Sequence, residues 1–284
     1  MTDDGISAAE VLELYGVVPV DRDACTRLLA DPASAPGGVP AVDGLLDRLR
    51  RDLGAFAPVA PGRTQDPLTA LAAYLAFAPE IVAWHQARGV GDDVTRATLA
   101  DVGRQLALHR QTYGELGLET WWWLAVHMAG ALFQLGRLQH QLHRQPTSVP
   151  GVVEEGEWVL GLHIPPTGPL GPAEVDRSLA TAGTFFARHF PDQPVRVATC
   201  TSWLLDPYLV ERLAPQSNTA QFARRFTVFG DAVDSADDAM YFTFRTRDLG
   251  ALDQLPRQTS LQRTVLERIE AGGTWQVAIG YLRL

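Results

Sequence analysis

The sequence predicts an α/β protein of the α+β type in two parts, a helical N-terminal domain at residues 1–128 and a mixed β-sheet covered by helices at residues 129–284. Two observations support this prediction. Apolar residues recur at three- and four-residue spacing through the first part, which is typical of amphipathic helices. In the second part, short runs rich in aromatic and β-branched residues interleave with helical runs, as expected for a sheet covered by helices.

The first part is expected to form a small helical bundle. Its apolar spacing predicts helices near residues 7–15, 22–30, 41–53 and 92–111. In the last of these, Leu99, Val102 and Leu106 share one face with His109. Proline and glycine separate the helices, most densely in the PASAPGGVP segment from Pro32 to Pro40.

The second part is expected to alternate strands with helices. The predicted strands are Leu132 to Leu142, Trp158 to Ile164, Val195 to Cys200, Phe226 to Phe229, Met240 to Phe244 and Trp275 to Leu284. One helix is predicted from Pro172 to Phe190, because apolar residues line one side of it. A second helix carries Leu261, Val265 and Ile269 on one face. The order of these elements implies a mixed sheet.

Composition excludes several classes of protein and site. The net charge is -9 and no basic block occurs, which argues against a nucleic-acid partner. All 24 basic residues are Arg, so imine chemistry through a protein lysine is excluded. Cys25 and Cys200 are the only cysteines and are far apart in sequence, which argues against a disulfide framework or a cysteine-rich zinc site. His140 and His143 would point to opposite faces of a strand, so no metal site is predicted.

The expected location is the cytoplasm. No run of about 18 apolar residues suggests a membrane span, and the first residues, MTDDGISAAE, lack the basic start and apolar middle of a secretion signal. We therefore expect no membrane partner. The sequence leaves the oligomeric state open, including a homo-oligomer.

A glycine- and proline-rich turn, HIPPTGPLG from His163 to Gly171, joins a predicted strand to a predicted helix. Backbone N–H groups at a helix N-terminus are unpaired and lie at the positive end of the helix dipole, which suits a phosphate or pyrophosphate. Gly168 and Gly171 allow close approach of a ligand, and Pro172 fits the first helical turn. The alternative is a stiff connection that binds nothing.

Four segments carry a resemblance to a known family. They are LFQLGRLQHQL from residue 132, GLHIPPTGPLGPAEVDRSLATAGTFFARHFP from residue 161, CTSWLLDPYL from residue 200 and LAPQSNTAQFARRF from residue 213. The chain resembles actinobacterial and clostridial proteins that combine an N-acyltransferase N-terminal domain with a GNAT-like C-terminal domain. The resemblance spans most of the chain and is most specific over residues 131–230.

The resemblance implies a GNAT-like fold that binds acyl-CoA as co-substrate on the loop between a central strand and the following helix. In this chain the loop residues would be Pro166, Thr167, Gly168, Leu170 and Gly171. GNAT enzymes usually begin this loop with Arg or Gln, and here that residue is absent. Prolines at positions 165, 166 and 169 also remove three backbone donors.

Three residues are candidates for the chemistry. His163 ends the strand before the turn and could accept the proton of an amine, although a buried or capping histidine is the alternative. Cys200 could act as a nucleophile with His163 as base, but a cysteine at a strand end more often serves packing. Ser202 could protonate the departing thiolate or merely line the site. Asp206, before Pro207, is expected to cap a helix.

The resemblance therefore predicts an N-acyltransferase that moves an acyl group from a CoA thioester to a small-molecule amine by direct attack. The donor could also be the phosphopantetheine arm of an acyl carrier protein. The rival hypothesis is a non-catalytic binding or regulatory protein, which the proline-rich loop and its missing basic residue favour.

Overall fold

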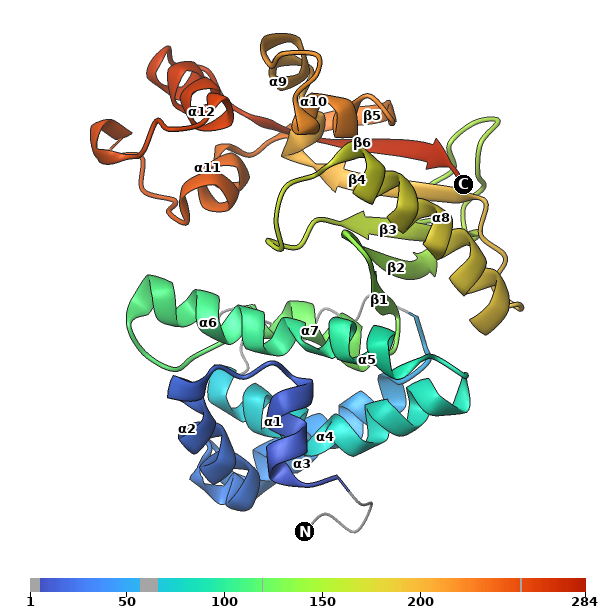
Figure 1. The fold of residues 1–284 in the computed structure, drawn as a ribbon, viewed down its shortest axis with the longest axis vertical. Coiled ribbons are helices and arrows are strands. Elements are labelled where there is room, and N and C mark those ends of the chain that lie inside the picture. Colours follow the sequence, from blue (N-terminus) through green and yellow to red (C-terminus); the bar gives the residue numbers. More distant parts are fainter. Residues whose placement is uncertain (1–5, 57–65, 119, 251) are drawn as a thin grey trace. The chain divides into compact units, whose positions relative to one another are not determined.

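The computed structural model describes residues 6–56, 66–118, 120–250 and 252–284. The chain divides into two compact units (Figure 1). Unit 1 comprises Met1–Leu135 and Gln139–Arg144, and unit 2 comprises Gly136–Leu138 and Gln145–Leu284. Among the described residues, the strands are ordered β1-β2-β3-β4-β6-β5 in a six-stranded mixed sheet.

Unit 1 is mainly helical, as the apolar spacing predicts. Its helices are α1 (Ala8–Leu14), α2 (Pro19–Ala30), η1 (Pro32–Ser34), α3 (Gly38–Asp52), α4 (Pro67–Ala87), α5 (Asp92–Leu99), α6 (Asp101–Tyr113) and α7 (Trp121–Met128). The helix expected over residues 92–111 is two helices, which meet at Ala100. Leu99, Val102 and Leu106 are nevertheless all buried, so the predicted apolar face exists across the break.

Helix α4 forms the centre of unit 1, and the sequence reasoning missed it. Asp66 caps its first turn by accepting hydrogen bonds from the backbone N–H groups of Leu68 and Thr69. The helix carries apolar residues on all of its sides, so its sequence lacks the three- and four-residue apolar spacing that predicts an amphipathic helix. By length and composition alone α4 could cross a membrane. A buried core helix passes the same test, and over half of the tested segment is buried inside the protein.

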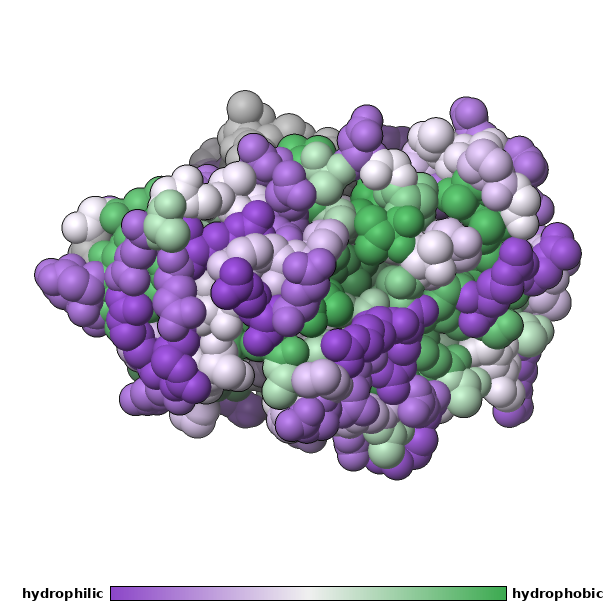
Figure 2. Space-filling view, turned by 90° about the horizontal axis from the view of Figure 1, so that it is seen from above, coloured by the Kyte–Doolittle hydropathy of each residue, from purple (hydrophilic) through white to green (hydrophobic). Residues whose placement is uncertain are grey.

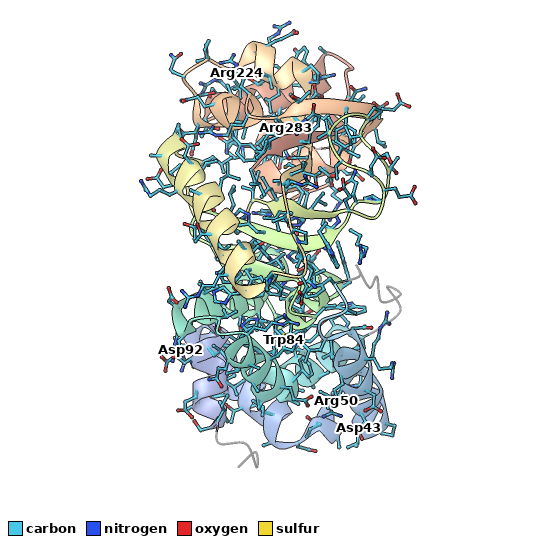
Figure 3. The ribbon with its side chains drawn as sticks, turned by 90° about the vertical axis from the view of Figure 1, so that its right-hand side faces the viewer. Asp43, Arg50, Trp84, Asp92, Arg224 and Arg283 are labelled. Atoms are coloured by element: carbon cyan, nitrogen blue, oxygen red, sulfur yellow. The ribbon has the colours of Figure 1, made fainter. Side chains whose placement is uncertain are left out.

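Two tyrosine hydroxyls connect the core helices of unit 1. The Tyr15 hydroxyl donates to the carbonyl of Tyr74 on α4 at 2.7 Å, and the Tyr74 hydroxyl donates to the carbonyl of Trp121 at 2.7 Å. Trp84, near the end of α4, is labelled in Figure 3. Its ring packs against the backbone of Gly54 and Gly130, and a side chain added at Gly130 would collide with the ring. These contacts fix α4 against the elements on either side of it.

The predicted strand from Leu132 to Leu142 is wrong in one respect: it is a hairpin. Strand β1 (Leu132–Leu135) and strand β2 (Leu138–Arg144) are joined by the turn at Gly136 and Arg137. Gly136 has φ +69°, a conformation that favours glycine and allows the tight reversal. The chemistry of this turn matters for the site described below.

Unit 2 contains the parallel strand pair that the helix α8 covers (Figure 1). Strand β3 (Trp158–His163) precedes α8 (Pro172–His189), and strand β4 (Val197–Ser202) follows it. The two strands are parallel, with Leu160 opposite Ala198. All three elements agree with the sequence prediction to within two residues.

Antiparallel strands complete unit 2. Strand β6 (Gln276–Arg283) pairs with β4 along its length, and β5 (Thr227–Asp234) pairs with the other edge of β6. The remaining elements are η2 (Trp203–Leu205), α9 (Pro207–Arg212), α10 (Asn218–Ala223), α11 (Ala236–Phe244), η3 (Leu252–Gln254) and α12 (Ser260–Glu270). Helix α11 corrects the strand predicted from Met240 to Phe244, because these residues form the end of a helix that starts at Ala236.

The carboxylate of Asp206 stabilises the core of unit 2. It is 1% exposed and caps α9 by accepting a hydrogen bond from the backbone N–H of Tyr208 at 2.8 Å, as predicted. The Arg268 guanidinium donates to both carboxylate oxygens, and the backbone N–H of Gln276 donates to one of them. Arg268 in turn stacks on the rings of Tyr208 and Trp275. One side chain thus connects α9, α12 and β6.

The outer surface of unit 2 is partly apolar. Seen from the end that carries α9 and α12, hydrophobic atoms lie between hydrophilic ones (Figure 2). The large exposed hydrophobic side chains of unit 2 include Val228, Val233, Phe242, Leu249 and Leu284.

Candidate functional site at the turn before helix α8

The turn between β3 and α8 runs from residue 164 to residue 171 and leads directly into the first helical turn. Gly171 is the N-cap of α8, and no side chain caps the helix there. Pro172 occupies the first helical position, where a missing N–H costs no hydrogen bond. The helix N-terminus therefore keeps backbone donors for another group.

The backbone donors of the turn are mostly unoccupied by protein groups. The Thr167 N–H donates to the Pro165 carbonyl at 2.8 Å. Within the described part of the chain, no protein acceptor is found for the N–H groups of Gly168, Leu170 and Gly171. Gly168 has φ +126°, and a side chain added there would meet nothing within 4 Å. Open space therefore lies beside this part of the turn.

One side chain approaches the helix N-terminus. Glu174, in the first turn of α8, places a carboxylate oxygen 1.9 Å from where a Cβ on Gly171 would be. Its other oxygen accepts a hydrogen bond from Arg177 at 3.1 Å. An acidic side chain is favourable at this end of a helix. The Glu174 side chain is 53% exposed, so it has room to move aside when an anion binds.

A guanidinium holds the turn from its other side. Arg137, in the β1–β2 turn, donates from Nη1 to the Pro165 carbonyl at 3.0 Å. It also donates from Nη2 to the Gly168 carbonyl at 2.6 Å and from Nε to the Pro169 carbonyl at 2.8 Å. Burial lowers the pKa of this guanidinium, which still stays protonated at neutral pH. Three carbonyl oxygens of the turn thus face one positive charge.

His163 lies where the sequence analysis placed it. It is the last residue of β3 and is half-buried, next to the start of the turn. Ser202 is the last residue of the neighbouring parallel strand β4. Because the carboxyl ends of parallel strands meet at one edge of a sheet, the structure brings the ends of β3 and β4 to the same edge.

Cys200 and Ser202 differ in what their surroundings allow. Cys200 is buried, and burial raises the pKa of its thiol to about 12, which disfavours the thiolate that a nucleophile needs. The Ser202 hydroxyl oxygen accepts a hydrogen bond from the backbone N–H of Leu204 at 3.1 Å and so begins η2. This arrangement leaves the hydroxyl hydrogen of Ser202 available to donate.

Among the described residues, no group of three or more His, Cys, Asp or Glu side chains could hold a metal ion. His140 is fully buried, and burial lowers its pKa to about 3. Such a histidine is neutral and belongs to the packed interior.

Comparison with known families places the whole chain. Residues 7–130 match the N-acyltransferase N-terminal domain, and residues 132–282 match the GNAT-like C-terminal domain. The chain belongs to the GNAT-like acyltransferases. No curated protein sequence matches it.

Solved structures of acyltransferases share this fold over nearly the full length. One, in complex with decanoyl-CoA and teicoplanin, is 33% identical, with a TM-score of 0.80 over 98% of this chain and 87% of the other. Another, a mutant in complex with octanoyl-CoA, is 31% identical, with a TM-score of 0.81 over 98% of this chain and 87% of the other. A third, in complex with CoA and 10C-teicoplanin, is 32% identical with a TM-score of 0.81, and covers 99% of this chain and 88% of the other. This GNAT-like acyltransferase is therefore an enzyme of the same fold.

Sequence reasoning found the turn of this GNAT-like acyltransferase but missed Arg137. Arg137 is 28 positions before Pro165 in the sequence. It lies in a hairpin turn, in the middle of the segment that was predicted as a single strand. One signal could have found it. A GNAT-like loop without its usual basic residue suggests that a positive charge comes from elsewhere in the chain.

Proposed function

We propose that this acyltransferase moves a medium-length acyl group from acyl-CoA to an amine of a small molecule. The observation that carries the proposal is the match, over 98% of this chain, to an acyltransferase solved with decanoyl-CoA and teicoplanin. Teicoplanin is accordingly the first acceptor to test. Use of acyl-CoA also supports a location in the cytoplasm.

The turn before α8 is proposed to hold the phosphates of the acyl donor. The N–H groups of Gly168, Leu170 and Gly171 are the donors, with the α8 dipole behind them. Pro166 and Thr167 contribute shape, because Pro166 has no N–H and that of Thr167 is already bonded. Binding of these phosphates moves the Glu174 carboxylate away from Gly171, because the two negatively charged groups would repel each other at the helix N-terminus.

Transfer is proposed to proceed by direct attack. The amine nitrogen attacks the thioester carbonyl carbon, a C–N bond forms and the C–S bond breaks. His163 accepts the proton that the amine nitrogen loses. The departing sulfur takes a proton from the Ser202 hydroxyl, and the proton on His163 is released to solvent, from which Ser202 regains one. Cys200 has no part in this scheme, because its thiol is buried and protonated.

An acyl carrier protein is a second source of the same chemistry, because its phosphopantetheine arm also carries a thioester and a phosphate. The arm has one phosphate where CoA has a pyrophosphate, so the same turn could bind both. Parallel assays with decanoyl-CoA and with a decanoyl carrier protein separate the two donors.

The test is a turnover assay on the full chain. Decanoyl-CoA, octanoyl-CoA and acetyl-CoA are each incubated with teicoplanin, while free CoA thiol is measured by colour reaction and the product by mass spectrometry. We expect thiol release that depends on the acceptor, together with a product heavier by one acyl group. Absence of an acylated product with every donor, at millimolar concentration and with a panel of amines, would refute the proposal.

A further inference from the structure

The backbone at Arg137 is held in place by contacts other than those of its side chain with the turn before α8. Gly136 and Arg137 form the tight reversal between β1 and β2. The next residue, Leu138, donates its backbone N–H to the buried Ser178 hydroxyl of α8 at 3.1 Å. The base of the Arg137 side chain is thus tied to the same helix whose N-terminus completes the candidate phosphate site.

The three hydrogen bonds of Arg137 decide which way the peptide groups of the turn point. In a trans peptide the carbonyl and the N–H point in opposite directions. With the Pro169 carbonyl held at 2.8 Å by Nε of Arg137, the N–H of Leu170 points away from the guanidinium. The other two bonded carbonyls, of Pro165 and Gly168, precede prolines and orient no N–H, so they serve to fix the path of the chain.

Apart from the buried side chains of Pro165 and Leu170, few contacts hold the turn. Its one internal backbone hydrogen bond joins Thr167 to Pro165, and residues 166–169 are exposed. Charged donors in a planar fork form stronger and more directional hydrogen bonds than neutral groups. Arg137 is therefore the main polar constraint on the exposed residues 166–169.

We propose that Arg137 is the positioning residue of the phosphate-binding turn, and this inference rests on the proposed function. By binding three carbonyls on one side, it turns the Leu170 N–H to the opposite side, away from the guanidinium. It also places a positive charge behind the turn, which compensates for the basic residue that the loop lacks. Arg137 acts through the backbone and does not touch the acyl group or the amine.

The test compares Arg137→Ala and Arg137→Lys with wild type in calorimetric titrations with CoA. We expect the dissociation constant to rise about tenfold or more for Arg137→Ala, since loss of each ordered donor weakens anion binding. Arg137→Lys keeps the charge but not the fork, so it restores only part of the affinity. The KM for acyl-CoA should rise in parallel, while kcat at saturating donor stays within about twofold.

Arg196→Ala is the matched control, because Arg196 is a largely exposed arginine of unit 2 whose ion pair with Glu157 is 3.6 Å long. It removes the same charge without touching the turn, and CoA affinity should not change. An Arg137→Ala variant that melts like wild type and binds CoA equally well overturns the inference. Wild type that binds no CoA refutes the proposed function instead, so the two failures are distinguishable.

Gly168→Ala reaches the same turn without removing the guanidinium. An alanine at φ +126° is strained although it has space, so the backbone should shift and move the Gly168 carbonyl away from Arg137. We expect the same loss of CoA affinity and the same rise in KM. This variant decides the question if Arg137→Ala fails to fold, and unchanged affinity for CoA would overturn the inference.

Discussion

His163 has to take a proton from the acceptor amine in the proposed reaction. We expect His163→Gln to lower kcat by about two to four orders of magnitude while CoA affinity is kept, because a glutamine cannot accept the proton. Steady-state kinetics with decanoyl-CoA and titration with CoA measure the two quantities separately.

His189→Gln is the matched control for that variant. His189 lies at the far end of α8, about 27 Å from the helix start for 18 residues. Its replacement should leave kcat unchanged. If His163→Gln turns over at the wild-type rate, the base is another group.

Asp206 is a buried carboxylate that connects three elements of unit 2. Replacing it by alanine leaves the Arg268 guanidinium, which stacks on the rings of Tyr208 and Trp275, without a carboxylate. We expect the free energy of unfolding to fall by about 3 kcal/mol or more, as when one partner of a buried ion pair is removed. Urea unfolding measures this loss. The exposed Asp192→Ala should change it by less than about 0.5 kcal/mol, and equal effects for the two variants would contradict this role.

At the scale of elements, replacing two helical glycines of unit 1 by alanine is predicted to change stability in opposite directions. Gly103 of α6 lies against the end of α1, where an added Cβ would be 2.2 Å from the Gly16 carbonyl oxygen. Gly44 of α3 faces open space, with nothing within 4 Å. Gly103→Ala should therefore destabilise the protein by about 3 kcal/mol through forced separation of backbone. Gly44→Ala should stabilise it by up to about 1 kcal/mol.

Thermal and urea unfolding of the two glycine variants measure both effects. Each replaces one helical glycine by the same residue, so helix propensity is matched and contact alone differs. Stabilisation by Gly103→Ala would show that α1 and α6 do not approach as closely as described.

The elements also show where sequence patterns succeed and fail. Helix α8 was predicted because its apolar residues line one side. Helix α4 was missed because it is apolar on every side and so has no period. The aromatic composition of the run from Met240 to Phe244 predicts a strand, whereas the acidic residues at the start of α11 favour a helix that ends with this run.

At the scale of the whole molecule, two buried histidines of unit 1 make stability depend on pH. Burial lowers the pKa of His85 to about 4 and that of His140 to about 3, from 6.5 in the unfolded chain. Between pH 6.5 and these values the unfolded state binds protons that the folded state does not, so stability falls as the pH falls. The effect is about 3 kcal/mol for each histidine by pH 4.

Urea unfolding at a series of pH values from 7.5 to 4.5 tests this expectation. The free energy of unfolding should decrease steadily below about pH 6.5. His85→Gln removes one of the histidines with a lowered pKa and should make the slope shallower. A flat profile for wild type would mean that both histidines are protonated in the folded protein.

The candidate site was predictable in part. The turn, its two glycines and His163 are contiguous in sequence, so a strand followed by glycines and a helix start was enough to locate them. Arg137 comes from a distant hairpin and Glu174 acts through a side-chain conformation, and neither arrangement leaves a local pattern. The burial of Cys200 follows from the packed sheet around it, which a short segment does not encode.

The proposed function requires that the amides of Gly168, Leu170 and Gly171 bind the phosphates of the acyl donor. The most direct measurement is a titration of isotope-labelled protein with CoA, in which the amide resonances of Gly168, Leu170 and Gly171 are followed by NMR. We predict that all three shift with CoA and stay in place with pantetheine, which has no phosphate. Saturable binding of CoA that leaves these three resonances unmoved would contradict the account.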